Sequence, residues 1–400
     1  MSRPQASERN TLWAHHHAQW RDPAQIVSQW HEAERTDPKL LQCQARGAWW
    51  ETLAETKATL LVTREYEHLV MALSATRAGP RISYLPLPHP SGIVVDRSRQ
   101  IIHVASTRNP NQLYELRPVG GRLARLDAKA ASDDGHPLVP VRSWFLPGCL
   151  YLHDLAWVGK GLFANAVGHN AVIQLFEDGR YEHVWWPCCI EKAGRPVFGW
   201  NQIQLNSIAA GDNLKSSFFS ASTDSPSSRR PGHQNFRVDG CGVIFSGRTR
   251  EPIVRGLTRP HSARMHQGRL WVDNSGYGEV GVVGPEGFMA VARLSAWTRG
   301  LCFCRHIAFV GVSRVIPRFR QYAPGLAVEA SECGVYALDT RTGRWLGSLI
   351  WPYGNQIFAI DWMPGSRSLG FPFQVGAKRA AGGSKALFYT YKINHRRNKL

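Results

Sequence analysis

The amino-acid sequence predicts an all-β protein, a six-bladed β-propeller (seven blades being the alternative) behind a short helical N-terminal extension. The chain has 400 residues, of which 43% are hydrophobic and 20% charged, enough apolar content for a large core. After Lys57, short β-branched and aromatic runs alternate with Gly, Pro, Asn and Asp turns at close spacing, a pattern typical of all-β folds. A repeated sequence unit then indicates which all-β architecture the chain has.

The repeated unit occurs six times. Each copy opens with a polar residue, followed by a small residue or turn former and a short apolar strand. In the first five copies, a turn and a second apolar strand complete the unit. The copies begin 38 to 64 residues apart, a spacing that suits about four strands each and predicts propeller blades. Their first residues are, in order, His89, His153, Asn206, His261, Arg299 and Gln356.

The two ends of the chain complete this picture. Residues 22–56 contain helix-like segments broken at Asp37-Pro38, so we expect a helical extension over residues 1–57. The last repeat lacks outer strands, and the apolar run at residues 58–73 can supply them, closing the propeller over residues 58–364 and leaving no exposed sheet edge. Residues 365–400 read as a basic, flexible tail. The seventh blade of the alternative would be a degenerate unit at residues 116–143.

Charge and cysteine content constrain partners and compartment. The formal net charge is +18, and eight of the excess charges lie between Gly365 and Leu400, where there is no acidic residue. The remaining arginines are scattered, without a nucleic-acid motif, which argues against a nucleic-acid partner. No apolar run is long enough to span a membrane, and the N-terminus lacks a secretory signal. With no CxxC pair among eight cysteines, we expect reduced thiols and a cytoplasmic protein.

Specific segments carry a resemblance to known propellers. The run LPLPHPSGIVVDRSRQIIHVAST resembles the opening of NHL-repeat and gluconolactonase-like propeller units. SYLPLPHPSG, STRNPNQLYEL, GLTRPHSAR and LWVDNSGYGE are similar to segments of an uncharacterised bacterial propeller family, known only as a domain of unknown function. The resemblance extends over about residues 59–364. It implies the fold and no activity.

Three histidines share the first position of the repeat and suggest a metal site. In a propeller, equivalent positions of the innermost strands form a ring around the central channel, so His89, His153 and His261 are expected to converge. Three imidazoles suit zinc first, with iron or copper as alternatives, and leave a coordination position open for catalysis. A polar channel without metal is the competing interpretation.

Two families of propellers bear on this metal prediction. The arrangement of three channel histidines is similar to that of peptide amidating lyases, though nothing else in the sequence matches them. Gluconolactonase-like propellers instead use Glu, Asn and Asp for a divalent cation. The histidine-rich ring departs from that pattern, so calcium-dependent lactonase activity is not expected.

Other polar residues are expected near the same channel mouth. Arg264, Arg108 and Tyr277 could hold or deprotonate a substrate, while Asn206, Gln356, Arg299 and Asn274 could bind it. Ordinary turn chemistry is an equally good account of Arg264, Arg108 and Tyr277, and the better one for Asn274.

The sequence therefore predicts a metal-dependent lyase or hydrolase that acts on a small polar or peptide-like substrate in the channel. A redox metal and oxygen chemistry are a further option. The alternative function is a non-catalytic propeller that binds protein or glycan partners on one face. The two predictions differ in a testable way, because the enzyme needs converging imidazoles and an open channel, whereas the binding protein needs an exposed apolar patch.

Overall fold

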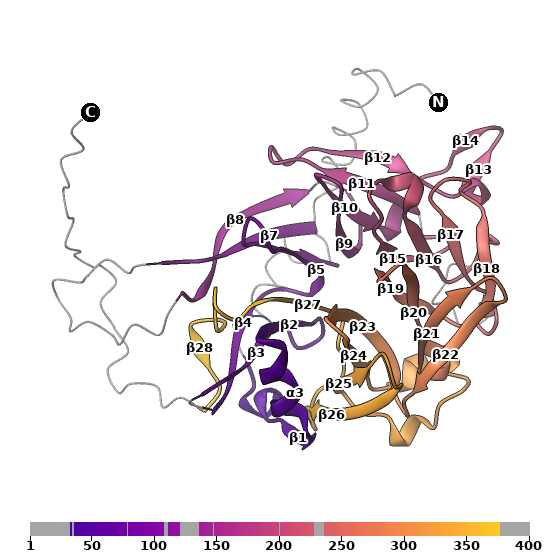
Figure 1. The fold of residues 1–400 in the computed structure, drawn as a ribbon. Helices are drawn as coiled ribbons and strands as arrows, with labels where there is room; N and C mark the ends of the chain where they lie inside the picture. Colours follow the sequence, from indigo (N-terminus) through magenta and orange to yellow (C-terminus); the bar gives the residue numbers. More distant parts are fainter. Residues whose placement is uncertain are drawn as a thin grey trace, which may run out of the picture.

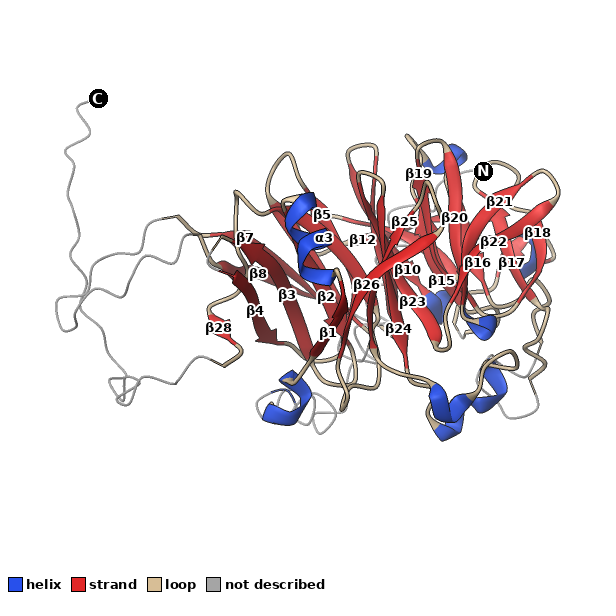
Figure 2. Cartoon of the chain, turned by 60° about the horizontal axis from the view of Figure 1, so that its bottom comes forward, coloured by secondary structure: helices blue, strands red, loops and turns tan. Residues whose placement is uncertain are grey.

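The computed structural model shows six antiparallel sheets arranged around a central axis (Figure 1). It describes residues 33, 36–77, 79–107, 111–120, 136–146, 148–199, 201–227 and 236–376. The fold is a six-bladed β-propeller, which confirms the predicted fold class. Seen from the side, the strands run between the two faces of the ring (Figure 2).

Each blade has four neighbouring antiparallel strands, the first of which is the inner strand. We number the blades in the order in which their inner strands occur along the chain. Blade 1 contains β5 (Pro90–Asp96), β6 (Ile101–Ser106), β7 (Asn111–Pro118) and β8 (Leu138–Leu146). Blade 2 contains β9 (Leu152–Val158), β10 (Gly161–Ala166), β11 (Ala171–Leu175) and β12 (Tyr181–Trp185). Blade 3 contains β15 (Leu205–Ala209), β16 (Phe218–Ala221), β17 (Gly242–Ser246) and β18 (Pro252–Leu257).

The second half of the ring follows the same order, with additions at two outer edges. Blade 4 contains β19 (Pro260–His266), β20 (Arg269–Asn274), β21 (Glu279–Gly284) and β22 (Gly287–Arg293). Blade 5 contains β23 (Trp297–Cys304), β24 (Ile307–Ser313), β25 (Gly334–Asp339), β26 (Arg344–Ile350) and an added β1 (Gln44–Gly47). Blade 6 contains β27 (Ala359–Pro364), β2 (Ala58–Arg64), β3 (Leu69–Thr76), β4 (Gly79–Pro86) and an added β28 (Phe373–Gln374).

Short elements occupy the connections between strands. A small hairpin pairs β13 (Glu191–Lys192) with β14 (Arg195–Pro196). Helix α3 (Trp49–Thr56) packs against β3 and β26. The 3-10 helices are η1 (Pro38–Leu41), η2 (Val167–His169), η3 (Cys188–Ile190), η4 (Leu214–Ser216), η5 (Ser275–Tyr277), η6 (Pro317–Tyr322) and η7 (Val328–Ala330).

Strands from both ends of the chain close the ring. Strand β27 pairs antiparallel with β2, from Ala58 opposite Pro364 to Thr63 opposite Ala359. The seventh-blade alternative is wrong, because Leu116 and Ser143 lie on β7 and β8, which pair within blade 1.

The two terminal segments differ from the expectation in their described parts. The N-terminal segment contributes β1 to the edge of blade 5 as well as helix α3. At the other end, Phe371 is fully buried and β28 pairs with β4, so the first residues of the expected tail belong to the propeller. Burial of a phenylalanine side chain is worth about 2 kcal/mol, which accounts for this anchoring. Most of residues 1–35 and all of 377–400 lie outside the described residues.

A repeated hydrogen bond joins the blades near the axis. At each of the six junctions, a side chain of one blade bonds to the backbone of the next inner strand or the residues leading into it. Satisfying buried backbone groups in this way fixes the rotation of each blade against its neighbour. The bonds are Thr63 Oγ1 to Ser91 O (2.6 Å), Ser91 Oγ to Leu152 O (2.8 Å), Ile208 N to Asp154 Oδ2 (2.9 Å), Ala263 N to Ser207 Oγ (2.8 Å), Gly300 N to Ser262 Oγ (2.7 Å) and Ile357 N to Ser313 Oγ (3.0 Å).

Candidate functional site

Strand register defines which side chains share one level of the channel. In five blades, the first residue of the inner strand lies opposite the last residue of the second strand, as with Pro90 and Ser106, or Pro260 and Asn274. The next residue of each inner strand therefore occupies an equivalent place. We call the level of these five residues the ring level. They are Ser91, His153, Asn206, His261 and Thr298.

Blade 6 contributes Phe358 to the ring level, and Arg299, the residue after Thr298 in blade 5, contacts the Phe358 ring. The ring centroid of Phe358 lies 5.1 Å from that of His153 and 5.9 Å from that of His261. The guanidinium carbon of Arg299 lies 3.8 Å from the same centroid. One buried aromatic ring thus brings two imidazoles and a guanidinium from three blades into a single cluster.

The structure brings together two of the three predicted metal ligands. The imidazole centroids of His153 and His261 are 5.8 Å apart. His89 instead lies two residues before the ring level, with its backbone N–H donating to Nδ1 of His68 at 3.1 Å and the two imidazole centroids 4.3 Å apart. Within the described ranges, no three His, Cys, Asp or Glu side chains are grouped so as to hold a metal ion. The three-histidine metal site stays a prediction.

His261 is the imidazole whose surroundings are best defined. Its Nδ1 lies 2.9 Å from Oγ of Ser262, and its buried Nε2 has no hydrogen-bond partner among the described residues. Burial, followed by the charges of Arg299 and neighbouring groups, lowers the pKa of His261 well below 6.5. The imidazole is therefore neutral at pH 7, and its Nε2 lone pair can accept a proton when Nδ1 carries the hydrogen toward Ser262.

Arg299 and Gln356, both predicted to bind substrate, are linked to each other and to a carboxylate. With the amide oriented to satisfy its surroundings, the Gln356 oxygen accepts from Arg299 Nη1 and its nitrogen donates to Glu65 Oε2 at 2.9 Å. Thr107 donates a short hydrogen bond to the other oxygen of Glu65. Burial lowers the pKa of Arg299, and the charge of Glu65 opposes that effect.

A second buried arginine, Arg259, was not found by sequence reasoning. Its Nη1 donates to Gln204 Oε1 at 2.5 Å and to Ser222 Oγ at 3.1 Å, and its guanidinium carbon lies 4.4 Å from the ring centroid of Tyr322. Burial lowers its pKa to about 10, and Arg299 acts in the same direction. Arg259, like His89, stands two residues before the ring level in its blade.

Backbone conformation marks this earlier position. His89, Tyr151, Gln204 and Arg259 all have positive φ, between 42° and 53°. This left-handed conformation is uncommon outside glycine. Its recurrence in four blades means that the chain turns at the same place before these four inner strands. The signal in the sequence is a polar or aromatic residue two positions before each ring residue.

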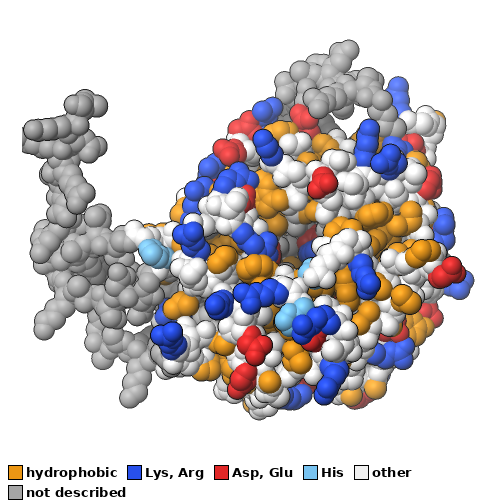
Figure 3. Space-filling view, viewed as in Figure 1, with side chains coloured by type: hydrophobic (Ala, Val, Ile, Leu, Met, Phe, Trp, Pro, Cys, Tyr) orange, Lys and Arg blue, Asp and Glu red, His pale blue; other side chains and the backbone are white. Residues whose placement is uncertain are grey.

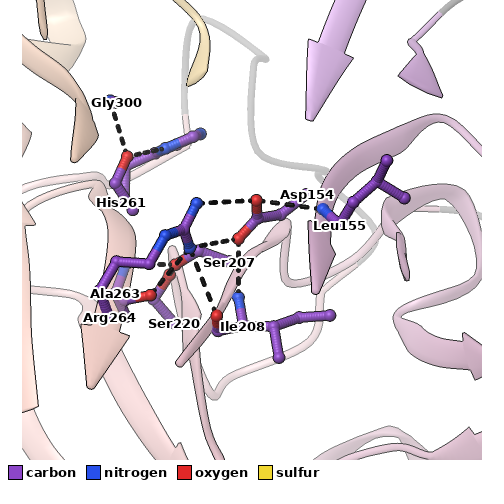
Figure 4. A network of polar contacts seen from close by, with 10 residues as sticks. Asp154, Leu155, Ser207, Ile208, Ser220, His261, Ala263, Arg264 and Gly300 are labelled. Carbon is purple, nitrogen blue, oxygen red and sulfur yellow. Dashed lines mark hydrogen bonds and ion pairs between the residues drawn. The ribbon is translucent and has the colours of Figure 1, made fainter. Parts of the chain in front are cut away.

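Arg264 has a structural partner that the sequence did not reveal. Its guanidinium makes two bonds to the Asp154 carboxylate, Nη1 to Oδ2 at 2.6 Å and Nη2 to Oδ1 at 3.0 Å (Figure 4). Nη1 also donates to the carbonyl of Ala263 at 2.9 Å. The guanidinium is thus held by Asp154 next to the axis, and its role as a substrate clamp stays a prediction.

The remaining predicted site residues lie elsewhere or serve the fold. Asn206 donates to the carbonyl of Pro260 at 2.9 Å. Asn274 accepts from Thr258 N–H at 2.7 Å and donates to Glu279 at 2.7 Å. The Tyr277 hydroxyl donates to Asp239 at 3.0 Å in an exposed part of the chain. Arg108 lies outside the described residues.

A cavity of about 390 Å³ opens at the other end of the channel, where the inner strands end. Its lining includes Arg97, Trp157, His266, Phe303, Asp361 and Trp362. Arg264 also lines it, so the Arg264–Asp154 pair lies between this cavity and the ring level. Lys and Arg side chains are distributed over the face seen in Figure 3, with Asp and Glu among them.

Comparison with protein families shows which family this chain belongs to. A family model matches residues 47–370, which run from the end of β1 to the segment after β27. The protein belongs to the family described as Domain of unknown function (DUF4915). This confirms the resemblance to an uncharacterised propeller family. No curated protein matches this DUF4915 chain.

Solved structures similar to this DUF4915 protein include three propeller-sized chains. A chain of a nidogen/laminin complex has a TM-score of 0.48 and 9% identity, over 76% of this protein and 98% of that chain. A gluconolactonase from Xanthomonas campestris has a TM-score of 0.42 and 14% identity, over 74% of this protein and 86% of that chain. A 6-phosphogluconolactonase candidate from Bacteroides uniformis has a TM-score of 0.43 and 11% identity, over 76% of this protein and 99% of that chain. All three TM-scores are below 0.5.

No helix among the described residues is long and apolar enough to cross a membrane.

Proposed function

We propose that this DUF4915 protein is an acid–base enzyme of the lyase or hydrolase class, with its active site at the ring level of the channel. The observation that supports the proposal is the cluster around Phe358. There, the imidazole centroids of His153 and His261 are 5.8 Å apart, and the guanidinium of Arg299 stacks on the same Phe358 ring. Imidazoles next to a fixed cation suit reactions in which a proton leaves as negative charge develops.

His261 is the proposed general base. Its Nε2 is buried without a partner among the described residues, and its lowered pKa keeps the imidazole neutral. In an elimination, Nε2 would take a proton from a carbon next to a carbonyl group. In a hydrolysis, it would take the proton from water. Both reactions share this first transfer, and His153 is the proposed acid that returns a proton to the leaving group.

Arg299 is the proposed electrostatic stabiliser. Arg299 is 7% exposed, and its guanidinium stacks on Phe358 and donates a hydrogen bond to Gln356. In such a buried place a cation interacts more strongly with developing negative charge than it would in water. The substrate is proposed to be a small polar or peptide-like molecule.

The test is turnover by purified protein. Wild type and the His153→Asn/His261→Asn variant are incubated with a metabolite extract, and substrate loss is followed by mass spectrometry. A His183→Asn variant, altered in an outer strand of blade 2, is the control. We expect at least one compound to disappear with wild type and the control, and about 100-fold more slowly with the double variant. Equal turnover by all three would contradict the proposal, and no turnover by wild type would favour the non-catalytic alternative.

A further inference from the structure

The charges around the ring level do not balance. Arg259 and Arg299 are 8% and 7% exposed, and the charge of Arg299 helps to lower the pKa of Arg259. Among the described residues, the carboxylate that acts on this pair is Glu65, through Arg299. Two guanidinium cations and one carboxylate leave one positive charge in excess in a buried region.

The hydrogen bonds of the two arginines lead to the same conclusion. Arg259 donates to Gln204 and Ser222, which are neutral acceptors, and stacks on Tyr322. Arg299 donates to the neutral amide of Gln356, and its buried Nε has no partner among the described residues. Proteins seldom bury a cation without an anion, because the lost hydration costs several kcal/mol per ion.

We infer that Arg259 and Arg299 recognise a carboxylate group of the substrate at the ring level. This inference rests on the proposed function and names its substrate class. A planar guanidinium matches the two oxygens of a carboxylate. The single excess charge favours a carboxylate, which carries one negative charge, over a phosphate monoester, which carries between one and a half and two.

The surroundings indicate what is attached to that carboxylate. Phe358, Tyr322 and Trp297 provide aromatic surfaces next to the two guanidinium groups. Such surfaces suit an apolar or aromatic body. The His261 imidazole centroid lies 5.9 Å from the centroid of Phe358, the ring on which Arg299 stacks. A carboxylate held by the arginines would therefore place its neighbouring atoms near the imidazoles.

Binding of simple carboxylates tests the inference without turnover. Acetate and benzoate are titrated at constant ionic strength against the full-length protein and followed by saturation-transfer NMR. Benzyl alcohol replaces the carboxylate by a neutral group, and inorganic phosphate tests the other anion. We expect saturable binding of benzoate or acetate with a dissociation constant below about 10 mM, and no binding of benzyl alcohol in that range.

Three variants identify the residues responsible. Arg259→Gln and Arg299→Gln should each weaken carboxylate binding at least about tenfold. Glu65→Gln removes the competing carboxylate and should strengthen binding about threefold or more, a gain that a misfolded variant cannot give. Arg97→Gln, at the opposite end of the channel, is the matched control and should bind as wild type does.

The outcomes separate this inference from the proposed function. Retained carboxylate binding by His153→Asn/His261→Asn, with turnover lost, would support both. Carboxylate binding without turnover in wild type would support the binding site and contradict the enzyme. The inference would be overturned if both arginine variants bound carboxylates as wild type does, or if Glu65→Gln bound them more weakly. It would also be overturned if benzyl alcohol bound equally well, if phosphate bound more tightly, or if neither carboxylate bound.

Discussion

The carboxylate of Asp154 on β9 and the guanidinium of Arg264 on β19 form a two-point ion pair between blades that are not neighbours. Blade 3 stands between them in the ring, and its Ile208 N–H donates to the same carboxylate. The pair therefore ties three blades together at the axis. It also separates the ring level from the cavity of about 390 Å³ at the other end.

Loss of this pair should destabilise the propeller. Asp154→Asn leaves the Arg264 guanidinium, with a side chain only 19% exposed, without its counter-charge. We expect the free energy of unfolding in urea to fall by about 3 kcal/mol. The control is Asp224→Asn, whose partner Arg255 has a side chain 63% exposed, and which should change stability by no more than about 1 kcal/mol. If both variants lose the same amount, the buried pair does not hold the blades.

Stability should fall on the acid side because of His261. Its pKa is lowered in the folded protein, so below about pH 6.5 the unfolded chain binds a proton that the folded chain does not. Between pH 6.5 and 5, this costs at most about 2 kcal/mol of the free energy of unfolding. We expect His261→Gln to lose less stability than wild type over that range in urea denaturation. His136→Gln, at an exposed position, should follow wild type. Identical pH profiles for His261→Gln and wild type would contradict the assignment.

Asp273 should have the opposite pH dependence. Burial raises its pKa well above 3.8, and Ser262 and Arg264 oppose this only in part. The folded carboxyl keeps its proton while the unfolded one ionises, so this group removes stability as pH rises above 3.8. We expect Asp273→Asn, which stays neutral, to be more stable than wild type at pH 7.5 by at least about 1 kcal/mol. The difference should shrink toward pH 4, and thermal unfolding at both pH values measures it.

The metal prediction has a direct test in metal analysis. His89 pairs with His68 rather than joining His153 and His261, so we expect tag-free protein to carry well below one equivalent of zinc, iron or copper. Turnover should also survive chelation. Mass spectrometry of wild type beside His153→Ala/His261→Ala decides the question. About one equivalent that disappears in the variant would restore the metal-dependent mechanism.

The fold could be predicted because its signal is local and repeated. Alternating strands and turn residues recur in each blade, and the missing strands of blade 6 could be placed at residues 58–73 from the need to close the ring. The site was harder to predict, since a shift of two residues changes which side chain reaches the ring level. In blade 1 this shift replaces His89 by Ser91, and in blade 6 it replaces Gln356 by Phe358.

Residues outside the repeat could not be placed at all. Glu65 stands in the turn between β2 and β3, and it reaches the site only because β2 pairs with β27 at the far end of the sequence. The ion pair of Asp154 with Arg264 depends on the relative positions of blades 2 and 4, which no local pattern encodes. Arg259 had a local signal, its place two residues before His261, that only the positive φ values make visible.

Closure of blade 6 by β2 and β27 sets the order in which the protein can form. Ala58 pairs with Pro364, so the sheet that contains β2 stays incomplete until β27 has left the ribosome. Until then β2 presents an unpaired edge, which other chains can join. Such a long sequence separation also slows folding. We therefore expect chains that end before Phe358 to aggregate more during synthesis than chains that extend past β28.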